Sequence, residues 1–119
     1  MKPDIHNPEC PSRVVLDRIS DKWTALIVLV LRDGPLRFSH LRVRVGGIAP
    51  KVLTETLRRL ERDGLLTRTA YAEVPPRVEY ELTALGHSLA EPITAISAWA
   101  EDHMRQISRA RQRYDRRAV

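Results

Sequence analysis

The chain has 119 residues, of which 43% are hydrophobic and 29% charged, and its formal net charge is +5. This length fits one domain, and the hydrophobic content can build a small core, which argues against a disordered chain. The longest apolar run, residues 25–31, is too short to span a bilayer, and the N-terminus has no signal-like hydrophobic segment. The single cysteine, Cys10, excludes an internal disulfide framework and a cysteine-based zinc site. We expect a soluble, cytoplasmic protein with no metal, cofactor or membrane partner.

The charge is unevenly distributed along the chain. Residues 32–77 contain ten basic and five acidic residues, whereas residues 78–104 contain five acidic residues and no Lys or Arg. Residues 105–119 add six arginines and one aspartate. A basic middle segment permits a polyanionic partner, but basic solvated faces are common, so charge alone does not establish nucleic-acid binding.

The N-terminal third is predicted to be an arm followed by two helices. Prolines and turn-forming residues predict an extended arm over residues 1–9. A short helix follows with Ser12 as its cap. A second helix begins at Ser20 or Asp21 and ends at the turn of residues 33–35. Its apolar face is wide, which predicts the central helix of the core.

The next segment predicts two helices joined by a turn. Residues 36–38 are long enough only for an edge strand, after which Ser39 caps a helix of about two turns that Gly46-Gly47 closes. The second helix covers residues 50–63, with Pro50 at its first position and Gly64 after its end. Its apolar residues form one narrow seam, and its other faces are polar and mostly basic, which predicts a helix docked on one side only. The seam consists of Leu53, Leu57 and Leu60.

The C-terminal half predicts a hairpin and a long helix. Residues 65–72 and 77–82 are rich in β-forming residues, and the two prolines between them end the ladder, as in a hairpin with a stiff tip. Thr83 caps a final helix, which Pro92 is expected to kink or split. Residues 105–117 have few apolar anchors, so we expect this arginine-rich end to fray.

The order of these elements predicts a winged helix-turn-helix. The fold class is mainly α with a small β-hairpin (α+β), in which a helix held by one seam can enter a major groove about 12 Å wide. We expect an N-terminal arm over residues 1–9, a winged domain over residues 10–104 and an arginine-rich tail over residues 105–119.

Several separated motifs, spread over roughly residues 9–104, resemble the HxlR-type winged helix-turn-helix regulators of bacteria, within the MarR-like superfamily. They are Cys10-Pro11, Asp21-Lys22-Trp23, the segments 33–41, 53–61 and 63–65, Val74-Pro75-Pro76-Arg77, and Leu82-Thr83-Ala84-Leu85-Gly86. The sequence departs from the family pattern at Ala49, where Ser is frequent, and at His40, where an acid is frequent. These departures leave the operator sequence open.

The resemblance implies a homodimer that binds a near-palindromic operator in double-stranded DNA, with repression as the expected outcome and an unidentified effector or oxidant as the signal. It also implies that the N-terminal and C-terminal helices form the dimer interface. The interface candidates on their apolar faces are Val15, Leu16, Leu89, Ile93, Ile96 and Trp99.

The resemblance places the recognition helix at residues 50–63 and the wing at residues 73–77. In the alternative interpretation, the helix face is merely solvated and Glu55 pairs with Arg58 or Arg59. Arg37 could equally stack at the sheet edge. The candidate DNA contacts are Lys51, Thr54, Glu55, Arg58, Arg59 and Arg62 on the helix, with Arg77 and Arg37 at the wing side.

Cys10 has two interpretations. Some members of the family sense oxidants or electrophiles through a cysteine at this position, which would require a thiolate, with Lys22 as a conceivable activator. The alternative is a small thiol packed at the dimer interface. His6 and Cys10 are too few ligands for a metal site, and we identify no nucleophile–base pair or phosphate loop, so we expect no enzyme. The competing function is a winged-helix module that binds another protein through the same basic face and through the acidic helix of residues 83–104, without specific DNA binding.

Overall fold

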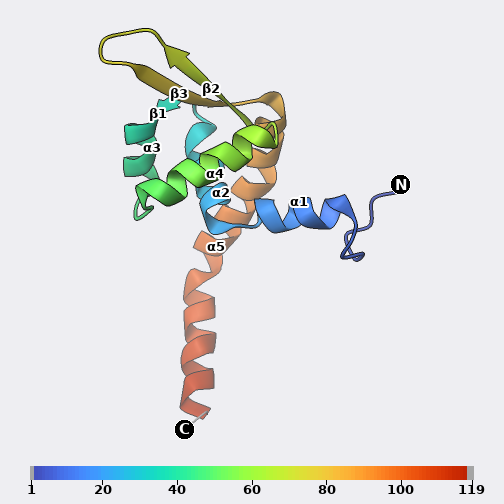
Figure 1. Cartoon of the computed structure of the whole chain (residues 1–119). Helices are drawn as coiled ribbons and strands as arrows, with labels where there is room; N and C mark the ends of the chain where they lie inside the picture. Colours follow the sequence, from blue (N-terminus) through green and yellow to red (C-terminus); the bar gives the residue numbers. More distant parts are fainter. Residues whose placement is uncertain (1, 118–119) are drawn as a thin grey trace.

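The computed structural model describes residues 2–117 and shows a body from which two helices project (Figure 1). The elements are α1 (Pro11–Ile19), α2 (Lys22–Leu31), β1 (Leu36–Arg37), α3 (Phe38–Val45), α4 (Pro50–Arg62), β2 (Leu66–Tyr71), β3 (Arg77–Leu82) and α5 (Ala84–Arg117). The body contains α2, α3, α4, the sheet and the first part of α5, whereas α1 and the rest of α5 extend away from it.

The sheet has three antiparallel strands in the order β1-β3-β2, so β1 is an edge strand as predicted. The hairpin pairs Leu66 with Leu82 at its base and Tyr71 with Arg77 at its outer end. The predicted wing is therefore present. We use this name for β2, β3 and the connecting residues 72–76.

The core lies between α2, α4 and the base of the sheet. Ile27, Val28 and Leu31 on α2 are fully buried, which confirms α2 as the central helix. The seam of α4 faces them, because no residue of the seam exceeds 3% exposure. Burying three leucines at about 2 kcal/mol each is enough to fix which side of α4 turns inward. The seam residues are Leu53, Leu57 and Leu60.

Two of the predicted helix caps are present. Asp21 accepts a bond of 3.4 Å from the Thr24 N–H at the start of α2. At the start of α5, the Thr83 hydroxyl accepts a 3.1 Å bond from the Gly86 N–H and donates a 2.6 Å bond to the Gly64 carbonyl. Thr83 therefore ties the start of α5 to the turn that follows α4.

The predicted caps at Ser12 and Ser39 are wrong. Helix α1 begins at Pro11 with Cys10 in the cap position, since a proline with its φ preset is suited to the first helical position. Helix α3 begins at Phe38, because the paired strand β1 leads straight into it. Neither helix has a side-chain cap bond.

The N-terminal arm is folded into turns rather than extended. The Asp4 and Asn7 side chains accept bonds of 3.0 Å from the backbone N–H groups of His6 and Glu9. Such local bonds are typical of turns that begin with Asp or Asn. They bring the segment back over Cys10, where the Asp4 N–H lies 3.3 Å from the sulfur.

Helix α5 is neither split nor frayed within the described residues. It continues through Pro92 to Arg117 as one helix. The carbonyl that loses its bond partner to Pro92 belongs to Ser88, which is solvent-exposed and can be hydrated. Arginine and alanine favour helix, and basic side chains in the last turn interact favourably with the helix dipole. The predicted boundary at residue 105 therefore lies inside a helix, and residues 118–119 lie outside the described residues.

Within residues 2–117, we find no helix long and apolar enough to cross a bilayer.

Candidate nucleic-acid interface

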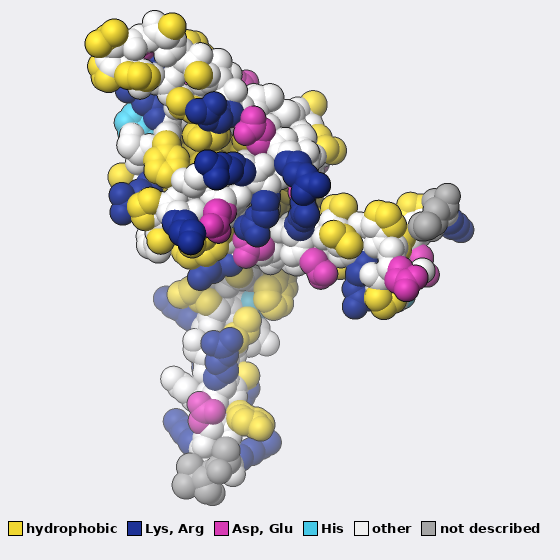
Figure 2. Space-filling model, in the orientation of Figure 1, with side chains coloured by type: hydrophobic (Ala, Val, Ile, Leu, Met, Phe, Trp, Pro, Cys, Tyr) yellow, Lys and Arg dark blue, Asp and Glu magenta, His cyan; other side chains and the backbone are white. Residues whose placement is uncertain are grey.

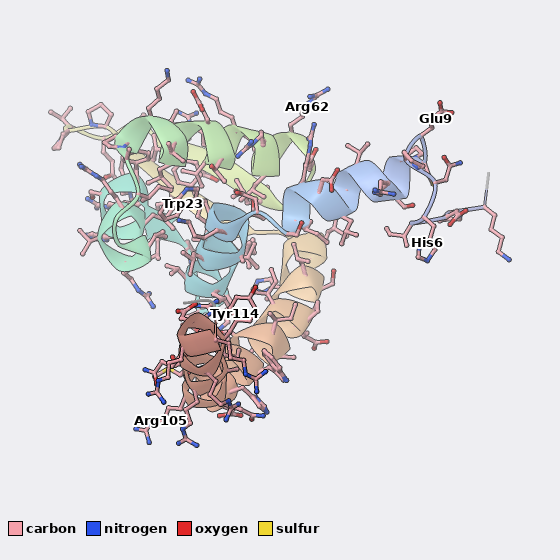
Figure 3. The ribbon with its side chains drawn as sticks, turned by 90° about the horizontal axis from the view of Figure 1, so that it is seen from below. His6, Glu9, Trp23, Arg62, Arg105 and Tyr114 are labelled. Atoms are coloured by element: carbon pink, nitrogen blue, oxygen red, sulfur yellow. The ribbon has the colours of Figure 1, made fainter. Side chains whose placement is uncertain are left out.

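The outer face of α4 is solvent-exposed. Because its leucine seam points into the core, the opposite side carries four exposed side chains at helical spacing. Figure 2 shows Lys and Arg side chains, interspersed with acidic ones, over this part of the body. Arg62, labelled in Figure 3, points away from the body. We call this set the outer stripe, and it consists of Lys51, Glu55, Arg58 and Arg62.

Glu55 does not pair within the helix. Among the described residues it forms no ion pair, so the predicted alternative of Glu55 bridging to a neighbouring arginine is not formed. Thr54 is half-buried beside the stripe and donates its hydroxyl proton to the Pro50 carbonyl, 2.9 Å away. Because Glu55 is not paired, the exposed side chains of the outer stripe are available to a ligand.

Arg59 lies on a different side of α4 from the outer stripe. Its guanidinium donates a 3.2 Å bond to the Thr56 hydroxyl and lies 4.0 Å from the Asp21 carboxylate. It thus faces the junction of α1 and α2. Arg59, a predicted candidate DNA contact, therefore lies apart from the outer stripe.

The end of α4 is linked to α1 by an ion pair that the sequence did not indicate. One guanidinium nitrogen of Arg18 donates to both carboxylate oxygens of Asp63, at 2.9 and 3.0 Å. Asp63 is the C-terminal cap residue of α4. Because the two residues are 45 positions apart, no local pattern could have predicted this contact.

The wing positions Arg77 differently from the prediction. Its guanidinium lies 3.1 Å from Glu73, 3.3 Å from Glu79 and 4.1 Å from the centre of the Tyr71 ring. The hairpin register places Tyr71 directly across from Arg77, which explains the stacking. The charge of Arg77 is therefore neutralised within the wing, and the side chain braces the hairpin instead of extending toward a phosphate.

The tip of the wing is apolar. Val74 is fully exposed and is followed by two exposed prolines, Pro75 and Pro76. Figure 2 shows hydrophobic side chains gathered at this end of the molecule. The tip of the wing therefore exposes an apolar surface to a ligand and no free positive charge.

Other basic residues lie near the outer stripe. Arg37 is exposed on β1, at the start of α3. Arg68 of β2 lines a shallow hollow together with Thr54 and Arg58. Arg68 is not predictable from the sequence as a site residue, since it lies on a strand and only the hairpin geometry brings it next to α4. Arg42 is also exposed on α3.

The predicted interface residues differ in exposure. Ile93 is 7% exposed and belongs to the core of its own chain, and Leu89 is half-buried against it. The rest lie on the two helices that project from the body. The exposed ones are Val15, Leu16, Ile96 and Trp99.

Cys10 is 3% exposed beneath the N-terminal turns. A hydrogen bond with the Ser12 hydroxyl, 3.1 Å from the sulfur, is the main cause that lowers the pKa of the thiol, and the Asp4 N–H adds to it. Lys22 is not the activator: its ammonium lies over the Trp23 ring, 4.3 Å from the ring centre. The groups that favour the thiolate are thus local hydrogen-bond donors.

The comparison with known families identifies the chain. The model of the HxlR-like helix-turn-helix family matches residues 18–108, which span the helix-turn-helix and the wing. The protein belongs to this family. Its members are transcriptional regulators with a helix-turn-helix DNA-binding domain, and not enzymes.

Relatives of this HxlR-family protein cover most of its length. The uncharacterized HTH-type transcriptional regulator YtfH of Escherichia coli is 44% identical over 99 residues, 83% of this chain and 79% of YtfH. The solved structure of the putative regulator ytfH from Salmonella typhimurium superposes with a TM-score of 0.87 at 40% identity, covering 93% and 99% of the two chains. The redox regulator HypR in its oxidized form gives a TM-score of 0.72 at 38% identity, covering 78% and 96%.

Proposed function

We propose that this HxlR-family protein is a sequence-specific DNA-binding regulator that occupies a near-palindromic operator as a homodimer. The observation that carries the proposal is the outer stripe: α4 is fixed by a buried seam and leaves a polar, mostly basic side open. A helix of this kind can read base edges in a major groove. Two copies in a dimer would engage successive major grooves about 34 Å apart.

The proposed sign of regulation is repression. Occupying promoter DNA is sufficient to block transcription. Because the ligand is chromosomal DNA, the proposed place of action is the cytoplasm of a bacterial cell.

The salt dependence of DNA binding tests this function. Lys51 and Arg62 at the two ends of the outer stripe are positioned for phosphates, so a dimer would neutralise about four phosphates and give a log–log slope of roughly −3 to −4. Fluorescence anisotropy with a labelled promoter fragment, measured from low to moderate salt, gives the slope. Because these two residues account for the phosphates counted here, the double variant Lys51→Gln/Arg62→Gln is expected to remove most of the slope.

Arg44→Gln is the matched control for that experiment, because Arg44 already lies 3.9 Å from Asp33 and is outside the outer stripe. It is expected to leave the slope nearly unchanged. A wild-type slope close to zero would contradict DNA binding through this face and favour the protein-interaction module instead.

We further propose that Cys10 makes the regulator responsive to oxidants or electrophiles. The support is the donor set around its sulfur, together with the similarity to HypR, whose structures are described as a redox regulator in oxidized and reduced forms. Because Cys10 is the only cysteine, a protein disulfide would have to join two chains. The cysteine is covered by residues 2–9, so reaction requires these turns to open.

The Ser12 hydroxyl provides a test of the thiolate. Removing it in Ser12→Ala takes away the largest cause that lowers the Cys10 pKa, so this pKa should rise toward the ordinary thiol value. The midpoint of the rate of iodoacetamide alkylation against pH should then move to higher pH, with slower alkylation near neutrality.

Ser20→Ala is the control for this measurement, since Ser20 bonds to the Leu16 carbonyl at the other end of α1. An unchanged midpoint in Ser12→Ala would contradict the proposed activation. The regulatory role is tested separately: Cys10→Ser should abolish any oxidant-induced change in DNA affinity, and a retained response would exclude Cys10 as the sensor.

A further inference from the structure

Helix α1 is held to the body of its own chain by few contacts. It has no buried side chain, and its apolar residues Val14, Val15 and Leu16 are 42–55% exposed. Only Ser20 and Asp21 join it to α2, and in Figure 1 it projects sideways from the body. Buried apolar packing therefore does not fix the angle between α1 and the rest of the chain.

One ion pair connects α1 directly to the end of α4. The Arg18 guanidinium donates to both carboxylate oxygens of Asp63, at 2.9 and 3.0 Å. Within residues 2–117, the other side-chain hydrogen bonds of α1 reach only residues 5–10. Figure 3 shows the end of α1 beside the end of α4 that carries Arg62. Arg18 is therefore the side chain that ties α1 to α4.

Asp63 lies at a fixed point of the body. Its N–H donates to the Arg59 carbonyl at 3.0 Å, which closes the last turn of α4. The carbonyl of the next residue, Gly64, accepts the Thr83 hydroxyl at 2.6 Å, so this turn is also tied to the start of α5. A carboxylate at the C-terminal end of a helix is unfavourable beside the helix dipole, and the Arg18 guanidinium offsets it. A movement of α1 at Arg18 is therefore transmitted to the end of α4.

A hollow of about 290 Å³ lies between the α1–α2 junction and the last turns of α4, and the ion pair spans it. A second contact spans the same hollow, where the Arg59 guanidinium lies 4.0 Å from the Asp21 carboxylate. Only the Arg18–Asp63 contact has hydrogen-bonding distances. Because packed side chains do not fill this space, the separation of its two sides depends on the ion pairs.

We propose that the Arg18–Asp63 ion pair is a positioning contact that sets the separation of the two α4 helices in the homodimer, and thereby the spacing of the two operator half-sites. The inference rests on the proposed function, in which α1 belongs to the dimer interface and α4 reads the major groove. Helix α1 is then part of the frame that the two subunits share, and Arg18 places the α4 of its own subunit against that frame.

The spacing of half-sites is sensitive to this placement. Two recognition helices match successive major grooves at a separation of about 34 Å. One additional base pair moves the second half-site by about 3.4 Å and rotates it by roughly 35°. A dimer with restrained α4 helices therefore tolerates few spacings, whereas a dimer without the restraint adapts to several at lower affinity. Surface ion pairs contribute little to stability, so removing this one should leave the fold intact.

Binding to duplexes of different spacing tests the proposal. The probe is the palindromic site that the wild-type protein selects from a random DNA library, with versions whose spacer is one or two base pairs shorter or longer. The wild-type protein should bind the selected spacing about tenfold more tightly than the others. Arg18→Ala should reduce this ratio at least threefold, because a symmetric dimer loses two ion pairs.

Arg13→Ala is the matched control. It removes an arginine of the same helix that bonds to the Ile5 and His6 carbonyls at 3.5 Å and not to α4. It should keep the wild-type ratio between spacings. Circular dichroism checks that each variant is folded, and sedimentation equilibrium checks that it is dimeric.

Charge reversal tests whether the ion pair itself is responsible. Asp63→Arg places two guanidinium groups together and should flatten the spacing preference as Arg18→Ala does. The double variant Arg18→Glu/Asp63→Arg restores a pair of opposite charges. It should recover most of the wild-type ratio, which a general loss of stability would not do.

A distance measurement without DNA provides an independent test. In a Cys10→Ser background, Glu55→Cys accepts one spin label per subunit on the exposed side of α4. Pulsed electron–electron double resonance should give a narrow distribution of label-to-label distances when Arg18 is present. The distribution should be clearly broader in Arg18→Ala.

Three results would overturn the proposal: an Arg18→Ala variant that loses the same factor of affinity at every spacing, a reversed pair that does not recover the wild-type ratio, or an unchanged distance distribution. Each of them leaves the proposed DNA binding intact. If the wild-type protein selects no DNA site, the proposed function fails instead. The distance measurement then still decides whether Arg18 positions α4 in the dimer.

Discussion

Gly86→Ala is expected to destabilise the protein by about 3 kcal/mol or more, at the upper end of what inserting one methyl group into a packed site costs. A β-carbon built at position 86 would overlap the carbonyl oxygen of Leu65 and also touch the Leu82 side chain. The Leu65 carbonyl cannot move easily, because it accepts the Thr83 N–H at 3.1 Å. Urea denaturation followed by circular dichroism should therefore show a large fall in the midpoint.

Gly64→Ala is the informative comparison for that variant. Gly64 has a φ of 77°, a left-handed conformation that disfavours a side chain, but a β-carbon there meets nothing within 4 Å. We expect it to cost only about 1–2 kcal/mol, from backbone strain alone. Equal midpoints for wild type and Gly86→Ala would contradict the close packing of α5 on the turn after α4.

The features predicted correctly from the sequence are those for which a local sequence pattern is compatible with only one structure. The leucine spacing of residues 53–60 specified which side of α4 is buried, and Asp21 and Thr83 cap the helices as predicted. These are short-range effects, in which a side chain interacts within three or four residues or with the nearest apolar surface. The same reasoning located the tip of the hairpin between its two strands, because Pro75 and Pro76 cannot join a ladder.

Two expectations about α5 were wrong. Pro92 was expected to kink α5 or to split it, and the split is absent: α5 continues past Pro92, and the carbonyl left unpaired belongs to the exposed Ser88. The arginine-rich end was expected to fray for lack of apolar anchors, although Ile107 and Tyr114 continue a stripe that begins in the core. Counting apolar residues missed this, whereas following their spacing from Leu89 onward would have indicated it.

The long-range contacts could not be predicted from one sequence. Whether an arginine is free depends on which carboxylate the fold places beside it. Arg77 is held by Glu73 and Glu79, and Arg59 lies near Asp21. Arg58, close in sequence to Arg59, forms no ion pair within residues 2–117. The structure thus divides the arginines of a segment with a net positive charge into those that form ion pairs within the protein and those available to a ligand.

Because Arg58 is one of the unpaired arginines, Arg58→Ala is expected to have the largest effect on DNA binding. Arg58 is exposed at the middle of the outer stripe, and a guanidinium there can form a bidentate bond with a guanine, worth about 1–3 kcal/mol per subunit. In a dimer both contacts are lost, so affinity for the operator should fall about a hundredfold. Affinity for random DNA should fall much less, because that binding depends on phosphates.

Arg58→Lys and Arg44→Ala distinguish base reading from charge. Lysine keeps the positive charge but lacks the planar fork of donors, so Arg58→Lys should retain binding to random DNA while losing most of the preference for the operator. Arg44→Ala, at a residue already near Asp33, should change neither. If Arg58→Ala weakened operator and random DNA equally, Arg58 would be a phosphate contact, and sequence recognition would have to come from elsewhere on α4 or from the apolar tip of the wing.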